Sequence, residues 1–332
     1  MTAGIYTTCP QSKDVPAATY LERIAQVARW SEDAGAAGML VYTDNGIVDP
    51  WLVAQEAIAA TEALRPLVAV QPIYLHPYAV AKMITSLAYL HGRAVDLNML
   101  AGGFRNDLQS LGDETPHEAR YERTVEYARI ITGLLRGEVV TAEGRWYRVK
   151  NLRLTPPLPS ELMPRLLISG SSPAGLAAAH AIGALAVRYP KPADEEERDA
   201  GPRPPGGLGV RVGVIARASG EEAWQVARER FPDDRRGRLT HGLAMKVSDS
   251  HWHRELSARD PGEDESSPYW LGPFNNGQTF CPYLVGTHER VGAELARYLA
   301  AGFSTFILDI PPDERELRET AAAFEAARGA TA

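Results

Sequence analysis

The sequence predicts an α/β protein, and within that class a closed (β/α)8 TIM barrel formed as a single domain over residues 1–332. Short apolar segments alternate with amphipathic helical segments along the 332-residue chain, an order typical of parallel strands joined by helices. Three helix-to-strand joints share one pattern, in which a glycine ends the helix: Gly35, Gly183 and Gly302. A doubly wound open sheet is the alternative, but no Gly-x-Gly-x-x-Gly pattern follows the first strand. Eight strands over about 300 residues favour the barrel.

Eight segments are predicted as barrel strands. Each is short, mostly apolar and bounded by turn residues, as expected of strands buried on both faces. They are residues 4–9, 38–43, 67–73, 95–100, 166–169, 184–188, 210–216 and 304–309. Helices are predicted between them at residues 77–90, 120–135, 173–182, 221–230 and 288–299, with two earlier ones beginning after Thr19 and Asp49 and a last one after the final strand.

Three helices begin with a recognisable cap. Asp49 followed by Pro50 combines an N-cap acceptor with a first-turn proline. Thr19 with Glu22, and Ser219 with Glu222, match the capping box, in which the first side chain accepts a hydrogen bond from the backbone three residues later. These caps predict where the helices start.

Three segments depart from a regular barrel. Residues 137–165 form an insertion after the fourth helix, with a hairpin predicted at 138–150. Residues 193–207 are charged and rich in proline and glycine where the sixth helix should be, so that helix is expected to be cut short. Residues 231–280 are polar and long, which predicts a lid or a disordered loop after the seventh strand.

The composition restricts the class of partner. A formal net charge of −7, without a cluster of Lys and Arg, argues against nucleic acid. Cys9 and Cys281 lack CxxC spacing and fit a reducing compartment. No signal pattern and no stretch of about 18 apolar residues is present. We therefore expect a cytoplasmic protein that binds a small organic molecule and no membrane.

A Gly/Ser turn follows the predicted strand at 166–169 and opens a predicted helix. It consists of Gly170, Ser171 and Ser172, with Pro173 next. Backbone N–H groups at a helix start lack intrahelical partners and carry the positive end of the helix dipole, and the two hydroxyls add donors for an anion. The turn therefore predicts a phosphate-bearing cofactor. Serine and proline are equally ordinary helix-start residues, so simple capping is the alternative.

With these elements in order, the chain resembles the bacterial luciferase-like monooxygenase family, and most closely its alkanesulfonate monooxygenase branch, along nearly its whole length. The matching stretches occur in the family's order at residues 20–26, 49–54, 98–103, 118–123, 170–172 and 209–211. The resemblance implies a barrel enzyme that takes reduced FMN from a separate NAD(P)H:flavin reductase and reacts it with O2 to a flavin hydroperoxide. It also implies insertion of one oxygen atom into an organic substrate, and a homodimer or homotetramer.

The resemblance assigns cofactor residues by position. Ser171 and Ser172, beside Gly170 and together with Tyr121, would hold the FMN phosphate, although Tyr121 could instead be a core or surface aromatic. The ring system would be flanked by Asn98, Ala101 and Gly102 and bordered by Gln71 and Tyr74. Small residues after a barrel strand let a flat ligand approach the backbone, but a glycine pair there can also be only a turn.

Departures from the sulfonate-cleaving branch restrict the substrate. The branch has a cysteine after its second strand, where this chain has Ile47, and a histidine on its seventh strand, where this chain has Gly213. It also has an arginine on a mobile loop, where this chain has about Gly277. Arg211 alone is kept, and a single arginine on a strand can simply pair with a carboxylate. Because a sulfonate needs charge-matched recognition, we do not expect sulfonates as substrates.

Candidate catalytic residues are those that follow barrel strands, together with Arg211 on the seventh strand. We select Asp44, Asn45, His76 and Arg211; Asp44 or His76 could serve as acid or base, although His76 precedes Pro77 and could only shape the start of the helix. Other side chains that qualify by position are Gln11, Arg105, Arg188 and Tyr189. His251 and His253 have metal-like spacing, but no further ligand completes the set, so no metal site is predicted. Trp270, Phe274 and Phe280 could form a water-excluding cover.

The first functional hypothesis is a two-component monooxygenase that uses reduced FMN to oxygenate a medium-sized organic molecule in secondary metabolism. A deazaflavin-dependent hydride-transfer enzyme on the same fold is the second hypothesis. A catalytically silent flavin-binding protein is the third, because the sixth helix is eroded and the sulfonate residues are lost.

Overall fold

The structure is a computed structural model that describes residues 3–170, 172–199, 201, 203–247, 255–259 and 267–331. Eight parallel strands pair side by side and the first pairs with the last, which closes a barrel. In barrel order they are β1 (Gly4–Thr8), β2 (Gly38–Val41), β3 (Arg65–Val70), β4 (Asp96–Met99), β7 (Leu166–Ser169), β8 (Leu185–Arg188), β9 (Leu208–Arg217) and β12 (Phe303–Leu308). The predicted barrel is confirmed, and closure excludes the open doubly wound sheet.

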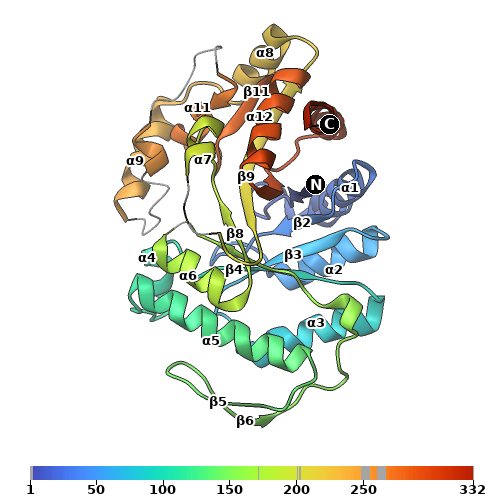
Figure 1. Ribbon diagram of the computed structural model, residues 1–332, viewed down its shortest axis with the longest axis vertical. Coiled ribbons are helices and arrows are strands. Elements are labelled where there is room, and N and C mark those ends of the chain that lie inside the picture. Colours follow the sequence, from blue (N-terminus) through green and yellow to red (C-terminus); the bar gives the residue numbers. More distant parts are fainter. Residues whose placement is uncertain are drawn as a thin grey trace.

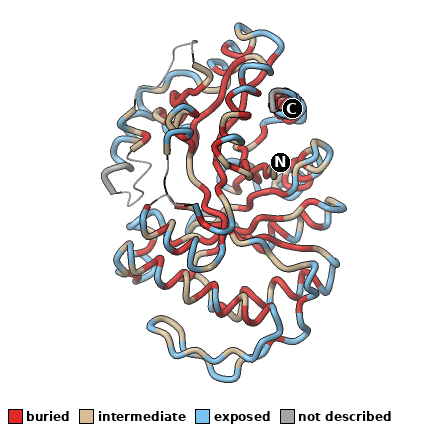
Figure 2. The backbone as a smooth tube through the Cα atoms, viewed as in Figure 1, coloured by how far each residue is buried: buried red, intermediate tan, exposed pale blue. Residues whose placement is uncertain are grey.

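Helices surround the barrel and pack their apolar faces on its outer surface (Figure 1). They are α1 (Tyr20–Asp33), α2 (Pro50–Ala60), α3 (Pro77–His91), α5 (His117–Leu135), α6 (Pro173–Ile182), α8 (Gly220–Arg230), α12 (His288–Ala300) and α13 (Glu314–Thr331). Short 3-10 turns lie at η1 (Ala17–Thr19) and η2 (Ser160–Leu162). Figure 2 shows the consequence, since buried residues follow the strands and the inner faces of the helices while exposed residues lie on the outer faces.

Two of the three predicted caps are confirmed. Asp49 accepts a hydrogen bond from the backbone of Trp51 (2.9 Å), and Ser219 accepts one from the backbone of Glu222 (3.1 Å). Thr19 is the N-cap of α1 by position, but the capping-box prediction is wrong there: its hydroxyl donates to the carbonyl of Pro16 (3.3 Å) and caps nothing. The 3-10 turn that precedes α1 offers this carbonyl instead.

A polar and aromatic plug fills the barrel near the amino ends of its strands. Tyr6 donates a hydrogen bond to the carboxylate of Asp96 (2.7 Å), and both residues are fully buried. The backbone N–H of Arg165 donates to the same carboxylate (2.8 Å). Apolar side chains from the strands pack around this group. Any pocket in the barrel must therefore open at the carboxyl ends of the strands, where the βα loops lie.

The hairpin and the shortened sixth helix are confirmed. Strands β5 (Val140–Glu143) and β6 (Arg148–Leu152) pair antiparallel, below α3 and α5 in Figure 1. The helix after β8 is α7 (Ala193–Arg198), only 6 residues long.

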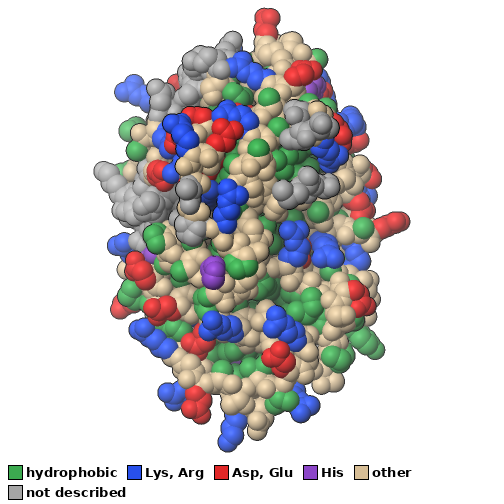
Figure 3. All heavy atoms as spheres, in the orientation of Figure 1, with side chains coloured by type: hydrophobic (Ala, Val, Ile, Leu, Met, Phe, Trp, Pro, Cys, Tyr) green, Lys and Arg blue, Asp and Glu red, His purple; other side chains and the backbone are tan. Residues whose placement is uncertain are grey.

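On the face drawn in Figure 3, basic side chains are interspersed with acidic ones, so this face mixes both charges.

Residues 231–280, for which a lid or a disordered loop is predicted, contain regular structure, so the disordered alternative is wrong for those parts. The segment contains α9 (Arg235–Val247), α11 (Gly272–Asn275) and strand β10 (Tyr269–Trp270). β10 pairs with β11 (Tyr283–Thr287), a strand that the sequence analysis missed. β11 in turn pairs with the second half of β9, with Tyr283 opposite Gly213. Because β9 extends beyond its barrel neighbours, its outer half would be an unpaired edge, and β11 covers that edge. Residues 248–254 and 260–266, including His251 and His253, lie outside the described residues.

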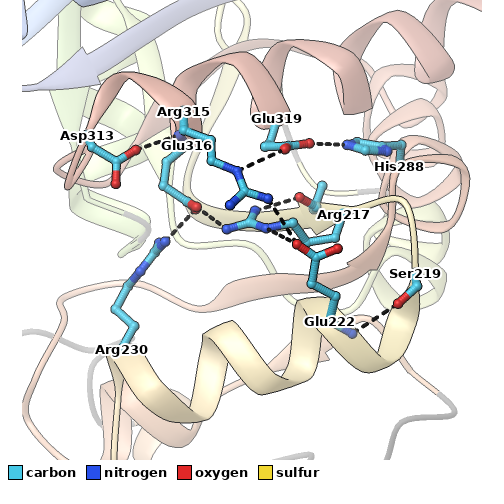
Figure 4. Close-up of polar contacts among 10 residues, drawn as sticks. Arg217, Ser219, Glu222, Arg230, His288, Asp313, Arg315, Glu316 and Glu319 are labelled. Carbon is cyan, nitrogen blue, oxygen red and sulfur yellow. Dashed lines mark hydrogen bonds and ion pairs between the residues drawn. The ribbon is translucent and has the colours of Figure 1, made fainter.

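The C-terminal helix is fastened to the barrel by a network of ion pairs (Figure 4). Arg217 on β9 donates to Glu316 on α13, and Arg230 on α8 contacts the same carboxylate. Arg315 extends the network to Glu222 (2.9 Å). The side chains of Arg217 and Glu316 are only 3% and 7% exposed. Removal of one partner would therefore take the nearest counter-ion from a buried charge and leave it only a second partner.

Candidate functional site

A cavity opens at the carboxyl ends of the barrel strands and is lined by the loops that follow them. Eight of the residues selected from the sequence line it: Asp44, Gln71, Asn98, Gly102, Tyr121, Gly170, Ser172 and Arg211. Asn45, Ala101 and His76 do not line it, and Ser171 lies outside the described residues. Residues far apart in the sequence therefore meet at one site, as expected for a barrel.

One end of the cavity is formed by the start of α6. Ser172 is the N-cap of this helix, is 7% exposed and accepts a hydrogen bond from the backbone of Gly175 (3.1 Å). Ser172 therefore caps the helix and lines the cavity at once, so the two interpretations of the Gly/Ser turn are compatible. Burial raises the pKa of Tyr121, and a hydrogen bond with Ser172 only partly offsets this increase. The hydroxyl of Tyr121 thus stays protonated.

Gly170 and Tyr121 are in close contact at this end. A Cβ atom at Gly170 would lie 2.3 Å from the hydroxyl oxygen of Tyr121, and the positive φ of 156° is one that other residues rarely adopt. The ring of His117 lies edge-on to that of Tyr121, 5.2 Å between centroids. A helix N-terminus, a buried phenol and a residue without a side chain thus form a cradle suited to an anion.

The middle of the cavity is formed by the ends of β3, β4 and β7. Asn98 on β4 is 4% exposed, and its side-chain oxygen accepts a hydrogen bond from Ser169 (2.9 Å). Gly102 has a φ of 96°, and a Cβ atom there would lie 2.9 Å from the side chain of Leu108. Ala101 is buried beside the cavity. The absence of a side chain at Gly102 thus keeps the backbone accessible at this point.

A chain of hydrogen bonds joins the loops after β2, β3 and β4. Gln71 donates to the hydroxyl of Tyr74 (3.3 Å), and that hydroxyl donates to Asn45 (2.6 Å). Asn45 then donates to the backbone carbonyl of Asp107 (3.0 Å). Burial, with smaller contributions from the charges of Asp107 and Asp44, raises the pKa of Tyr74 to about 12. Asn45 therefore holds the rim of the cavity together.

Two carboxylates lie on one wall. Asp44 follows β2, and Asp107 belongs to α4 (Arg105–Ser110), a short helix after β4 that the sequence analysis missed. Asp44 accepts a hydrogen bond from the backbone of Gly46 (2.6 Å). Burial and then the charge of Asp44 raise the pKa of Asp107. The sequence signal for Asp107 was its position after the fourth barrel strand, where Arg105 alone was selected.

Arg211 lies on β9 and is 7% exposed. Its guanidinium carbon lies 4.7 Å from the ring centroid of Tyr42, and its Nη2 lies 3.7 Å from a carboxylate oxygen of Asp309. Nε and Nη2 have no hydrogen-bond partner among the described residues. Asp309 also accepts a hydrogen bond from Tyr283 (2.8 Å). The guanidinium is therefore oriented by aromatic stacking and by the carboxylate of Asp309, and its Nε and Nη2 are buried without a hydrogen bond.

Several sequence candidates have structural roles or lie away from the cavity. His76 is the exposed N-cap of α3, and its Nδ1 accepts a hydrogen bond from the backbone of Tyr78 (3.2 Å). Arg188 forms ion pairs with Glu196 and Asp199, each at 2.9 Å. Arg105 does not line the cavity. Among the residues that the structure describes, no group of three or more His, Cys, Asp or Glu side chains is placed to hold a metal ion.

Three further residues named from the sequence lie at the cavity. Two follow barrel strands, and the third is an aromatic residue expected in a water-excluding cover. Gln11, Tyr189 and Phe280 all line the cavity. The ring of Phe280 lies edge-on to that of Tyr42, 6.5 Å between centroids, so this part of the wall is aromatic. The neighbouring Cys281 is fully buried, and burial raises the pKa of its thiol. A thiol held protonated in this way is a poor nucleophile.

Comparison with known proteins identifies relatives over the whole length. Residues 1–305 match the family profile described as luciferase-like monooxygenase. The chain is 34% identical over 298 residues to 4-(gamma-L-glutamylamino)butanoyl-[BtrI acyl-carrier protein] monooxygenase BtrO of Niallia circulans, covering 87% of this chain and 86% of that protein. No helix in the described part of the chain is both long and apolar enough to cross a membrane.

Solved structures share the fold at low sequence identity. Long-chain alkane monooxygenase LadA superposes with a TM-score of 0.76 at 16% identity, covering 99% of this chain and 92% of that one. EDTA monooxygenase EmoA from Chelativorans sp. BNC1 has a TM-score of 0.73 at 14% identity, covering 99% and 95%. An F420-dependent secondary alcohol dehydrogenase has a TM-score of 0.67 at 18% identity, covering 99% and 100%. With the family profile and the Niallia circulans relative, the closed barrel and its cavity lead to one conclusion: this chain belongs to the luciferase-like monooxygenase family.

Proposed function

We propose that the chain is a two-component monooxygenase that takes reduced FMN from a separate NAD(P)H:flavin reductase and oxygenates a medium-sized organic substrate. The observation that carries the proposal is the cradle formed by Gly170, Tyr121 and the N-terminus of α6. It opens into the cavity and offers a helix dipole, a hydroxyl and close backbone approach to a phosphate. The residues present therefore fit a phosphate-bearing flavin.

The remaining cofactor residues follow from the same placement. Asn98, Gly102 and Gln71 line the cavity beyond the cradle and would border the flavin ring. Ala101 is buried next to Gly102 and would support the loop that borders the flavin ring. Bound reduced FMN supplies two electrons, so that one atom of O2 enters the substrate and the other leaves as water. Phe280 and Tyr42 contribute an aromatic wall that limits access of water to that chemistry.

Asp44 and Arg211 are proposed to hold and orient the substrate beside the flavin, because both line the cavity and carry charge. Asn45 does not line the cavity, and its proposed role is to hold the loop after β2 against α4 through its hydrogen bond to the carbonyl of Asp107. His76, selected from the sequence as an acid or base, lies at the start of α3 outside the cavity and receives no role in the proposed reaction. The Niallia circulans relative is named for a substrate bound to an acyl-carrier protein, so acyl thioesters are among the first substrates to test.

The test follows the absorbance of reduced FMN after rapid mixing with oxygenated buffer, with and without the protein. A reoxidation phase that is slower with the protein and accelerates when substrate is added supports the proposal. Reoxidation at the rate of free flavin contradicts it. Titration of the protein with oxidised FMN and with F420 then separates a deazaflavin enzyme, which binds F420, from a silent binder, which binds FMN without turnover. Sedimentation of the same sample tests the proposed homodimer or homotetramer.

A further inference from the structure

Opposite charges line the cavity, two carboxylates and one guanidinium, and only the guanidinium of Arg211 has an ion-pair partner among the described residues, Asp309 at 3.7 Å. Asp44 and Asp107 contribute two carboxylates to one wall, and among the described residues no Lys, Arg or His forms an ion pair with either. The side chain of Arg211 lines the same cavity, and two of its nitrogens make no hydrogen bond within the described part of the chain. Asp44 and Asp107 are partly exposed at the cavity and lack a counter-ion, so the wall that they form is suited to a cationic ligand group.

A fourth polar side chain supports this interpretation independently. Gln11 follows β1, is 6% exposed and lines the cavity. Its side-chain amide has no hydrogen-bond partner among the residues that the structure describes. Its amide atoms are not among the fully buried unpartnered atoms of the described chain, so they reach the cavity that the residue lines. A polar ligand that enters the cavity would satisfy this amide together with the donors of Arg211.

The charge of Asp44 acts on Asp107. Burial and the charge of Asp44 both raise the pKa of Asp107, as expected of like charges in a partly desolvated space. Each carboxylate remains a good acceptor: the backbone of Gly46 occupies one oxygen of Asp44, and Asp107 holds Asn45 through its backbone carbonyl rather than its side chain. A cation between them would relieve the repulsion.

We propose that the substrate is zwitterionic, with a protonated amino group bound at Asp44 and Asp107 and a carboxylate bound by Arg211 and Gln11. This inference rests on the proposed function, since it describes the substrate that the cavity holds beside the flavin. An ammonium group offers three donors to carboxylate oxygens, and a guanidinium recognises a carboxylate through paired N–H donors. Arg211 thus acts with Gln11 as a specificity determinant, and Asp107 joins Asp44 in that role.

The test is calorimetric titration of the protein loaded with oxidised FMN. The probes are straight-chain ω-amino acids of about four to eight carbons, with alkylamines, alkanoates and alkanols of equal length as controls. We expect at least one ω-amino acid to bind about tenfold or more tightly than the matching alkanol. Equal binding of all four classes at every length, or no binding of any probe, would overturn the proposal.

Substitutions assign the charges. Asp107→Asn and the double variant Asp44→Asn/Asp107→Asn should weaken amine-bearing probes about tenfold while alkanoates bind as before. Arg211→Gln should weaken alkanoates and spare alkylamines. Asp33→Asn, an exposed carboxylate on α1, is the matched control. If the aspartate variants lose the same affinity for every probe, with or without an amino group, the proposal is wrong. Circular dichroism confirms that each variant is folded.

Flavin fluorescence in the same samples measures FMN binding separately. Suppose that FMN binds and that its reoxidation depends on the protein, but that charged probes bind no more tightly than the alkanols. The proposal of a zwitterionic substrate is then wrong, while the proposed function stands. If FMN does not bind, the proposed function fails, and titration of the flavin-free protein still decides the charge preference.

Discussion

Gly170 and Tyr121 approach so closely that a Cβ atom on the glycine would lie 2.3 Å from the tyrosine hydroxyl oxygen. The contact places a phenol from α5 against the turn that begins α6, in the part of the cavity where a phosphate is proposed. Its geometry makes the cradle sensitive to a single added methyl group.

Gly170→Ala is expected to weaken FMN binding by about tenfold or more, because the methyl group must displace Tyr121 or shift the turn. The measurement is flavin fluorescence titration. Gly220→Ala is the matched control, since a Cβ atom at Gly220 meets nothing within 4 Å. Undiminished FMN affinity in Gly170→Ala would remove the cradle from the proposed phosphate site.

Ser172→Ala should lower both stability and FMN affinity. Loss of the N-cap acceptor costs about 1 kcal/mol of unfolding free energy, and loss of the hydroxyl removes a phosphate donor. Ser219→Ala removes an equivalent cap from α8, outside the cavity. We expect similar losses of stability by urea denaturation but weaker FMN binding only for Ser172→Ala, and more so with Tyr121→Phe added. Equal FMN affinity in the two serine variants would show that Ser172 is only a cap.

Glu316→Ala is expected to lower the free energy of unfolding by about 3 kcal/mol, because it removes the nearest counter-ion of the buried Arg217, leaving Glu222 at 3.7 Å, and also the partner of Arg230. Glu314→Ala, which breaks an exposed pair with Arg318 on the same helix, should change stability by less than about 0.5 kcal/mol. Thermal or chemical denaturation of the two variants measures the difference. Equal effects would mean that burial of the Arg217 pair adds nothing to the attachment of α13.

Protonation of Asp113 should make the protein less stable in acid. Burial opposes its ionisation, but hydrogen bonds from Arg123 and Thr115 outweigh burial and hold the pKa of Asp113 below its usual range. Because the folded-state pKa is lowered, this contribution to stability is present above about pH 4 and is lost as the pH falls through the lowered value. Denaturation midpoints between neutral and acid pH should therefore fall less steeply for Asp113→Asn than for the parent protein. Parallel pH profiles would contradict this role.

The barrel could be predicted from local patterns. The strand at 166–169 and the helix at 173–182 have the bounds that the sequence predicted, because apolar runs, glycine stops and helix caps act over a few residues. Strand β11 was missed because its reason for forming is the exposed edge of β9, more than one element away in the chain. The six-residue helix α4 carries too little periodicity to be recognised.

The cavity was predicted in part. Position after a strand selected Gln11, Asp44 and Tyr189, which all line the cavity, since parallel barrel strands bring their carboxyl ends to one face. Gln71, Asn98 and Arg211, which also line it, came from the family resemblance. The same rule selected His76, whose ring instead caps α3. Whether a side chain after a strand turns inward or caps the next helix depends on the competing backbone donors, which the sequence does not reveal.

The sequence by itself determined the order of strands and helices, the Gly/Ser turn and the family, because these depend on short-range periodicity and on motif order. Only the tertiary structure decided which charges meet. It brought Asp107 to the wall of Asp44, stacked Arg211 on Tyr42 and joined Arg217 to Glu316. Those relationships depend on closure of the barrel, which fixes side chains from distant segments within a few ångströms of each other, and no local pattern encodes that distance.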